Sequence, residues 1–205
     1  MNLEAVLPAL RRAGLLLDHT PWGVRFQRLT ACLLQTLSDS AAIPALSAGD
    51  IQRYSTLALL HDIGMRTVPR EILEKPGSLT REEFLTVKAH TTQGCELLER
   101  ITPLRQSETF PLACDVCRHH HERWDGSGYP DRLAGPEITP WVQAVGLADA
   151  FDALVHPRIR KPALPPAQAA GMIRRGACGV FDPQLLACFA RHLGPISRAD
   201  YSSAG

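Results

Sequence analysis

Hydrophobic residues recur along much of the chain at the three- and four-residue spacing of amphipathic helices. The first such segment runs from Leu3 to Leu17 and contains Pro8. Runs of alternating apolar and polar residues, which would indicate strands, do not stand out. The pattern predicts an all-α protein, with further helices over residues 22–37, 50–62, 68–74, 80–100, 108–121, 137–155 and 166–176, and a last helix after residue 182.

Short polar motifs predict where three of these helices begin. Thr80 and Glu83 have the spacing of a capping box, in which each side chain bonds to the backbone of the other residue. Asp50 is placed to cap the helix that ends near residue 62. Asp182, followed by Pro183, is placed to cap the last helix.

The size of the chain fits one domain with a short N-terminal addition. Its 205 residues are 45% hydrophobic, which is enough apolar material for a full core. We assign residues 1–20 to an N-terminal helix and connection, 21–198 to the main domain and 199–205 to a loose tail. The apolar face of the first helix is predicted to pack on its own domain, with a homodimer surface as the alternative.

Charge and cysteine content narrow the class of protein. Lys and Arg total 22 against 21 Asp and Glu, and this balance argues against a protein that binds a nucleic-acid polymer. No stretch has the length and apolarity of a membrane span, and the N-terminus lacks the order of a secretory signal, so membrane insertion is not expected. The 6 cysteines show no disulfide-framework spacing. These observations predict a cytoplasmic protein.

The stretch from His119 to Pro130 is the most distinctive part of the chain. A run of three histidines ends in a carboxylate and is followed by a loop with two glycines and a proline. Imidazole is a common ligand of transition metals, and a glycine-rich turn lets the backbone come close to a bound group. A histidine run by itself is equally consistent with a solvated helix end.

Three other segments supply further potential ligands. They are His61 with Asp62, His90, and Asp149 with Asp152 in an otherwise apolar helix. A carboxylate in such a helix needs a cation or a hydrogen-bond network as a partner. Singly, each histidine has an ordinary structural explanation.

Together with the histidine run, these segments predict a metal site between the helices of a bundle. Mixed nitrogen and oxygen donors suit Fe, Mn or Zn better than Mg or Ca. Two cations that share a carboxylate can polarise a phosphoryl oxygen and lower the pKa of a bridging water. A structural zinc site at Cys114 and Cys117 is the alternative, but no second pair of cysteines accompanies it.

These motifs resemble the HD-GYP domain, a branch of the HD metal-hydrolase superfamily that hydrolyses the bacterial second messenger cyclic di-GMP. The resemblance extends from about Trp22 to Phe189. It rests on the strings His61-Asp62-Ile63-Gly64, residues 72–83 (Ile-Leu-Glu-Lys-Pro-Gly-Ser-Leu-Thr-Arg-Glu-Glu), His90, residues 120–130 ending in Gly128-Tyr129-Pro130, Ala148-Asp149-Ala150-Phe151-Asp152-Ala153-Leu154, and Phe181-Asp182-Pro183. The family implies a single-domain helical bundle of the HD superfamily.

The resemblance also implies roles for the matching residues. One divalent metal would be held by His61, Asp62 and Asp149, and His61 and Asp62 would carry catalysis. Asp62 would bridge to a second metal, whose remaining ligands would be His90, His120 and His121. The metals would be Fe or Mn, with Zn as the alternative.

Substrate contacts are implied for a second set of residues. The loop formed by Gly128, Tyr129 and Pro130 would shape the nucleotide site. Because a phosphodiester anion needs fixed positive donors, Lys75, Arg158 and Lys161 are candidates for phosphate contacts. Lys161 is equally well explained as part of a solvated basic surface.

The sequence departs from the family pattern at several positions. Arg25 stands where the first helix of the family has a histidine ligand, and a guanidinium cannot ligate a cation. His19 is a poor substitute because its register is wrong. Met65 replaces a lysine near the substrate phosphate, and Gln143 replaces an arginine. The glutamate that would serve a third metal is absent at residues 21–22. Together these changes thin the positive lining of the site and weaken one of the two metal positions.

Two hypotheses of different classes follow. The first is a metal-dependent phosphodiesterase that hydrolyses cyclic di-GMP to pGpG, GMP or both through a metal-activated hydroxide. The second is a degenerate domain that binds cyclic di-GMP or a signalling partner protein without turnover. The intact His and Asp set favours the first, whereas Arg25, Met65 and Gln143 favour the second. The sequence leaves open the number and identity of the metals, and a related cyclic dinucleotide as the substrate.

Overall fold

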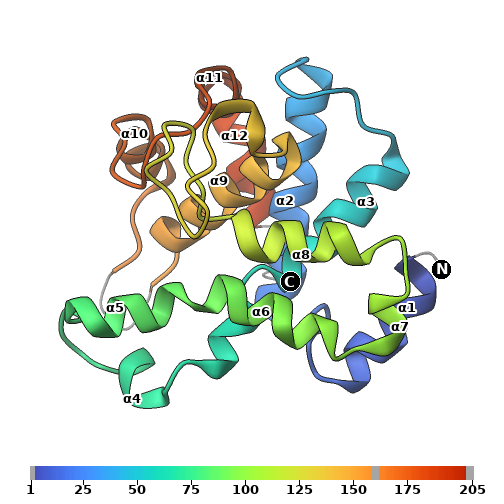
Figure 1. Ribbon diagram of the computed structural model, residues 1–205. Helices are drawn as coiled ribbons and strands as arrows, with labels where there is room; N and C mark the ends of the chain where they lie inside the picture. Colours follow the sequence, from blue (N-terminus) through green and yellow to red (C-terminus); the bar gives the residue numbers. More distant parts are fainter. Residues whose placement is uncertain (1–2, 158–161, 202–205) are drawn as a thin grey trace.

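A computed structural model describes residues 3–157 and 162–201 of the chain, and its regular elements there are helices (Figure 1). The α-helices are α1 Leu3–Arg12, α2 Pro21–Asp39, α3 Ala48–Leu57, α4 Arg70–Leu73, α5 Arg81–Lys88, α6 His90–Glu99, α7 Thr102–Arg105, α8 Phe110–His119, α9 Pro140–Val155, α10 Pro166–Arg174, α11 Pro183–Arg191 and α12 Leu193–Tyr201. Short 3-10 helices are η1 Ala58–Leu60, η2 Ile63–Thr67 and η3 Gly135–Glu137. The predicted all-α class is confirmed.

Helices α2 and α9 form the centre of the bundle. In α9, 13 of the 16 residues are buried, which fits a helix that is apolar on all sides. Helix α2 buries an apolar face that includes Phe26 and Leu33, and it packs against α3, α9, α11 and α12. Helix α8 packs against α9 and η1, and Figure 1 shows it crossing in front of this pair.

The N-terminal helix packs on its own domain. Helix α1 ends at Arg12 rather than near Leu17, and it accommodates Pro8. Its apolar face is buried and packs near α7. That face is therefore covered by the same chain, as the sequence predicts, and a homodimer would need another surface.

The start of α3 differs from the prediction. Ser47, not Asp50, is the N-cap, and its Oγ accepts a hydrogen bond from the Asp50 backbone N–H at 3.1 Å. The Asp50 carboxylate accepts the Ser47 backbone N–H at 3.1 Å in return. Asp50 is thus the third helical residue of a capping box, whose side chain bonds back to the backbone of the N-cap residue.

The predicted helix over residues 80–100 is two helices. The Thr80–Glu83 capping box that opens α5 is confirmed, but the helix ends at Lys88. Beyond Ala89, α6 starts at His90, whose side-chain Nδ1 bonds to the carbonyl of Val87 at 2.7 Å. Side-chain donors that occupy carbonyls in this way compete with the helical backbone pattern. Helix α5 buries no residue and projects with α4 from the body of the molecule (Figure 1).

The C-terminal end is more ordered than the sequence suggests. The Asp182 carboxylate accepts the Gln184 N–H at 2.6 Å, which confirms the predicted cap of α11. A further helix, α12, follows and packs against α2 with Ile196 fully buried. It extends to Tyr201, so the first part of the predicted loose tail is helical. Residues 202–205 lie outside the described part of the chain.

No helix in the described part of the chain combines the length and the apolarity needed to cross a bilayer. The longest, α2, carries Arg25, Arg28 and Asp39 among its 19 residues.

Two glycines allow backbone segments that carry histidine and aspartate to touch. A Cβ on Gly64, two residues after Asp62, would lie 1.9 Å from the carbonyl oxygen of His90. A Cβ on Gly146, three residues before Asp149, would lie 2.4 Å from the carbonyl oxygen of His120. These contacts leave no room for a side chain and hold the segments at a fixed distance.

We expect Gly64→Ala to lower the free energy of unfolding by about 3 kcal/mol, because the methyl group would force two backbones apart. Gly77→Ala is the matched control, since a Cβ there would meet nothing within 4 Å. Its effect should stay within about 0.5 kcal/mol. Urea denaturation measures both, and equal effects of the two changes would contradict the close contact at Gly64.

Candidate metal centre

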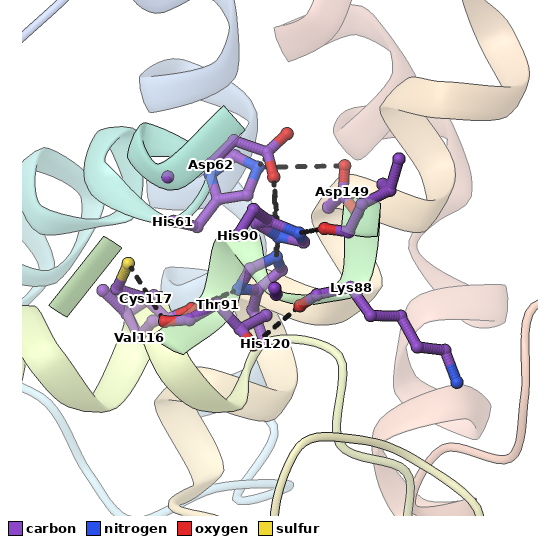
Figure 2. Close-up of polar contacts among 12 residues, drawn as sticks. His61, Asp62, Lys88, His90, Thr91, Val116, Cys117, His120 and Asp149 are labelled. Atoms are coloured by element: carbon purple, nitrogen blue, oxygen red, sulfur yellow. Dashed lines mark hydrogen bonds and ion pairs between the residues drawn. The ribbon is translucent and has the colours of Figure 1, made fainter. Parts of the chain in front are cut away.

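Six side chains from four segments converge in the middle of the bundle. Figure 2 shows five of them, namely His61, Asp62, His90, His120 and Asp149. The ligand atoms of Asp62, His90, His120 and His121 lie within 4.8 Å of one another. Those of His61, Asp62 and Asp149 form a second group of the same size. The structure thus brings together all the residues that the sequence singles out as metal ligands, and Asp62 belongs to both groups.

Each segment presents its donors at a helix end or on an inward face. His61 and Asp62 follow η1, the 3-10 extension of α3, and His90 is the first residue of α6. His120 caps the C-terminus of α8, and Asp149 lies on the central helix α9. The four segments come from separate parts of the chain, so the cluster exists only in the folded molecule.

The Asp62 carboxylate lies between the two groups. Its Oδ1 is 3.2 Å from His90 Nε2 and 3.7 Å from His120 Nε2. Its Oδ2 is 3.5 Å from His61 Nε2, and that nitrogen is 3.8 Å from Asp149 Oδ1. One oxygen therefore faces each group, which is the arrangement of a carboxylate that bridges two cations.

Backbone carbonyls determine the tautomers of three of the histidines. The Nδ1 atoms of His61 and His90 lie 2.7 Å from carbonyl oxygens, and Nδ1 of His120 lies 3.0 Å from another. Since a carbonyl only accepts, each Nδ1 must carry the hydrogen. The Nε2 atom of each neutral ring then has a free lone pair that points into the cluster, as in metal sites with an oriented imidazole.

These lone pairs have no donor that satisfies them. His61 Nε2 is buried and has no hydrogen-bond partner within the described residues. His90 Nε2 and His120 Nε2 lie 3.3 Å apart, although both are acceptors in this tautomer. Burying such atoms without a partner is costly, whereas a cation would satisfy them all. The donor set therefore fits divalent metal ions.

Burial and charge give the histidines different pKa values. Burial lowers the pKa of His120 and His121, which keeps these rings neutral and able to bind metal. For His61, burial is outweighed by the carboxylates of Asp62 and Asp149, and the pKa rises to about 9. Burial also opposes the charge of Asp62, yet the neighbouring imidazoles hold its pKa well below the usual range. A cation would take the place of the His61 proton.

Two polar residues beside the cluster make their contacts outside it. His119 turns away, with Nδ1 at 2.7 Å from Asp115 and Nε2 at 3.0 Å from Asp131. The buried Glu122 accepts the backbone N–H groups of Asp131 and Arg132 at 2.7 and 3.0 Å. The only signal for Glu122 was its place next to the histidine run.

The predicted substrate loop forms one wall of a cleft beside the cluster. Gly128 packs against the backbone of Glu122, where a Cβ would come within 2.4 Å of the Cα atom. Tyr129, which precedes a cis peptide bond to Pro130, stacks on His121 with ring centroids 4.7 Å apart. The cleft has a volume of about 480 Å³ and is also lined by α5 and the start of α6.

Lys75, one of the predicted phosphate contacts, does not line this cleft. The Lys75 ammonium is 2.7 Å from the Glu83 carboxylate. Arg158 and Lys161 lie outside the described residues. Gln143 is buried and donates to the carbonyl of Ile138 at 3.0 Å.

Arg25 has a carboxylate partner. Its Nη2 and Nε atoms lie 3.1 and 3.3 Å from the same oxygen of Asp152, which is almost fully buried on α9. His156 Nδ1 approaches that oxygen to 3.2 Å. Arg25 therefore balances the charge of the residue one helical turn beyond Asp149.

The cysteines do not form a metal site in the part of the chain that the structure describes. Its groups of three or more potential ligands contain no cysteine. Cys117 is buried, with its sulfur 3.8 Å from the carbonyl oxygen of Thr91. Cys114 and Cys117 therefore belong to the packing between α6 and α8, and the zinc alternative has no support.

Comparison with known proteins identifies the family. The family model described as the HD domain matches residues 13–185. The chain belongs to the HD domain family. It is 36% identical over 169 residues to a probable cyclic di-GMP phosphodiesterase of Vibrio cholerae, with 81% of this chain and 38% of that protein covered. It is 41% identical over 146 residues to a cyclic di-GMP phosphodiesterase of Pseudomonas aeruginosa, with coverages of 70% and 33%.

Other relatives act on a different dinucleotide. A 3'3'-cGAMP-specific phosphodiesterase of Vibrio cholerae is 31% identical over 152 residues, which covers 74% of this chain and 28% of that protein. The HD domain chain thus spans between about a quarter and two fifths of the length of these curated relatives.

A solved structure shares the fold. It is an HDG"Y"P protein from Bdellovibrio bacteriovorus, with a TM-score of 0.63 and 23% sequence identity. The match covers 83% of this chain and 51% of that one. The relatives and this neighbour confirm the resemblance to the HD-GYP branch that the sequence motifs indicate.

We expect Asp62→Asn to weaken both cation positions, because one oxygen of this carboxylate faces each group. Asp149→Asn should weaken only the position next to His61. Since loss of an outer-shell partner alone costs about 10- to 100-fold in metal affinity, each lost ligand should cost more than that.

Metal content after loading with Mn(II), measured by mass spectrometry, tests this expectation. His119→Gln is the matched control, since this neighbour of His120 faces Asp115 and Asp131 instead. Equal metal loss in Asp62→Asn and Asp149→Asn would show that Asp62 is not shared.

Arg25→Met should lower the free energy of unfolding by about 3 kcal/mol, because it removes two hydrogen bonds from the buried carboxylate of Asp152. Arg70→Met is the control, since Arg70 pairs with Glu74 in an exposed position. Its cost should stay below about 0.5 kcal/mol. The midpoints of urea unfolding measure both, and a cost for Arg25 no larger than for Arg70 would contradict a structural ion pair.

Proposed function

We propose that the chain is a metal-dependent phosphodiesterase that hydrolyses cyclic di-GMP to pGpG, GMP or both. The main observation behind this proposal is the position of the Asp62 carboxylate. One of its oxygens faces each of the two groups of potential metal ligands, and an open cleft lies beside them. Several relatives are named cyclic di-GMP phosphodiesterases, and these names support a cyclic dinucleotide as the substrate.

The six ligand residues would hold two cations at fixed positions. His61, Asp62 and Asp149 would hold one cation, and Asp62 with His90, His120 and His121 would hold the other. Bound Fe or Mn ions, or Zn, would supply a nucleophilic water at neutral pH and offset negative charge on the phosphoryl oxygens. The carbonyl bonds to the imidazoles hold the rings in place, so little reorganisation is needed as the reaction proceeds.

Arg25, which stands where the family has a histidine, affects one of the two metal positions. The cation held by His61, Asp62 and Asp149 would have three protein donors, and solvent would complete its shell. Arg25 does not ligate and is paired with Asp152. We therefore infer that this position binds metal more weakly than the position with three histidines.

Two other functions are distinguishable from this one. A domain that binds cyclic di-GMP or a signalling partner without turnover would keep the cleft but not the reaction. A phosphodiesterase for a related cyclic dinucleotide is favoured by the relative that is specific for 3'3'-cGAMP. A cytoplasmic location, a partner protein and a homodimer stay predictions from the sequence.

The test is hydrolysis by the purified chain, loaded anaerobically with Fe(II) or Mn(II). Cyclic di-GMP and 3'3'-cGAMP are supplied separately, and products are separated by chromatography. We expect pGpG or GMP from cyclic di-GMP, and loss of at least about 100-fold in rate in the His120→Ala, His121→Ala double variant. His119→Gln should keep the activity, since this side chain faces away from the cluster.

Each other outcome points to one alternative. Bound metal without product from either dinucleotide would support the non-catalytic domain. Faster hydrolysis of 3'3'-cGAMP would change the substrate, and full activity of the double variant would refute the ligand assignment.

A further inference from the structure

The cleft beside the metal centre carries two cationic side chains that the ligand cluster does not use. Lys88 comes from the end of α5, and Arg132 comes from the loop after Pro130. Neither of them pairs with a carboxylate in the described part of the chain. Lys75, by contrast, is held by Glu83. The cleft therefore has positive charge that is available to an anion.

Aromatic rings place the Lys88 ammonium over the cleft. Its Nζ lies 4.5 Å from the ring centroid of Tyr129 and 5.0 Å from that of Phe84. Figure 2 shows the Lys88 side chain extending away from the histidine and aspartate side chains. Ring faces attract an ammonium without neutralising its charge, so Lys88 is oriented and still able to bind an anion.

The Glu122 carboxylate, which accepts the backbone N–H of Asp131, also holds the backbone of Arg132 in place. The Arg132 N–H donates to Glu122 Oε1 at 3.0 Å, and the Arg132 φ of 58° lies in the left-handed region that few non-glycine residues occupy. The neighbouring Asp131 is engaged by Arg118 at 2.5 Å and by His119. That carboxylate is therefore already balanced by other groups, and the Arg132 guanidinium remains exposed at the rim of the cleft.

Tyr129 connects this cationic pair to the metal centre. One ring contacts both the candidate ligand His121 and the Lys88 ammonium. A molecule with one anionic group at the metals and another a short distance away would meet both features. A cyclic dinucleotide is such a molecule, since its two phosphodiesters belong to one ring and only one can occupy the metal centre at a time. Leu85, which is 57% exposed, adds an apolar wall suited to a base.

We propose that Lys88 and Arg132 bind the phosphodiester of the substrate that is not being hydrolysed, and so make the site prefer cyclic dinucleotides to simple diesters. The inference rests on the proposed function and names the residues that select its substrate. Both residues act by binding, because neither lies in the ligand cluster. A guanidinium and an ammonium are the donors that bind phosphate most strongly.

The experiment compares two substrates in the metal-loaded chain. Cyclic di-GMP has two phosphodiesters, and bis(p-nitrophenyl) phosphate has one. We expect Lys88→Met and Arg132→Met each to raise KM for cyclic di-GMP about tenfold with kcat unchanged, as for loss of one charge-assisted hydrogen bond. Turnover of bis(p-nitrophenyl) phosphate and the metal content should not change.

Two further variants separate binding from folding. Lys88→Arg keeps the charge and the contact with the rings, so KM should stay within about threefold of the parent value. Arg70→Met removes a cation from α4 that does not line the cleft, and it should leave KM unchanged. An unchanged KM in Lys88→Met and Arg132→Met, or an equal loss with both substrates, overturns the inference.

Calorimetric binding of cyclic di-GMP separates this inference from the proposed function. Binding without hydrolysis, with affinity lost in Lys88→Met and Arg132→Met, supports the cationic pair and refutes the phosphodiesterase. Hydrolysis with parent-like KM in both variants supports the phosphodiesterase and refutes the pair. A chain that neither binds nor hydrolyses cyclic di-GMP refutes both.

Discussion

Three buried imidazoles each give the Nδ1 hydrogen to a backbone carbonyl in their own segment, and the centre of the molecule depends on these bonds. They fix the rings of His61, His90 and His120 and direct the Nε2 lone pairs inward. While these rings are neutral, their Nε2 atoms are acceptors, and His61 Nε2 has no hydrogen-bond partner among the described groups. Because the pKa of His61 is raised to about 9, a proton occupies this nitrogen until a cation replaces it. A bound cation would therefore stabilise the folded chain as well as serve a reaction, because it binds the native arrangement and not the unfolded one.

The close approach of these segments requires glycine at the points of contact. Gly64 lies against the His90 carbonyl and Gly146 against the His120 carbonyl, so no side chain separates the donors. The buried negative charge of Asp152, close to the cluster, is balanced by an ion pair. Asp152 follows Asp149 by one turn on the apolar helix α9, and Arg25 pairs with it. The residue that removes a potential donor from the first position thus supplies the counter-charge for a neighbouring carboxylate.

The site has two parts with separate tasks, joined at Tyr129. The His and Asp cluster offers donors to cations, whereas the cleft offers ring faces, an apolar wall and cationic side chains. Glu122 supports the second part, since it accepts two backbone N–H groups of the loop.

The sequence by itself determined the helical class, the Thr80–Glu83 capping box, the Asp182 cap and the six residues that gather in the cluster, because these follow from local periodicity and from residue chemistry. It misplaced the start of α3 and missed the break at Ala89, where side chains compete for helix carbonyls. Only the tertiary structure decided that Arg25 pairs with Asp152, that Lys75 pairs with Glu83, and that Lys88 lies over Tyr129. Arg25 is far from Asp152 along the chain, and Lys88 is far from Tyr129. Lys75 and Glu83 are close in sequence, but a turn separates them. A sequence pattern states which charges are present, and the fold alone determines which of them meet.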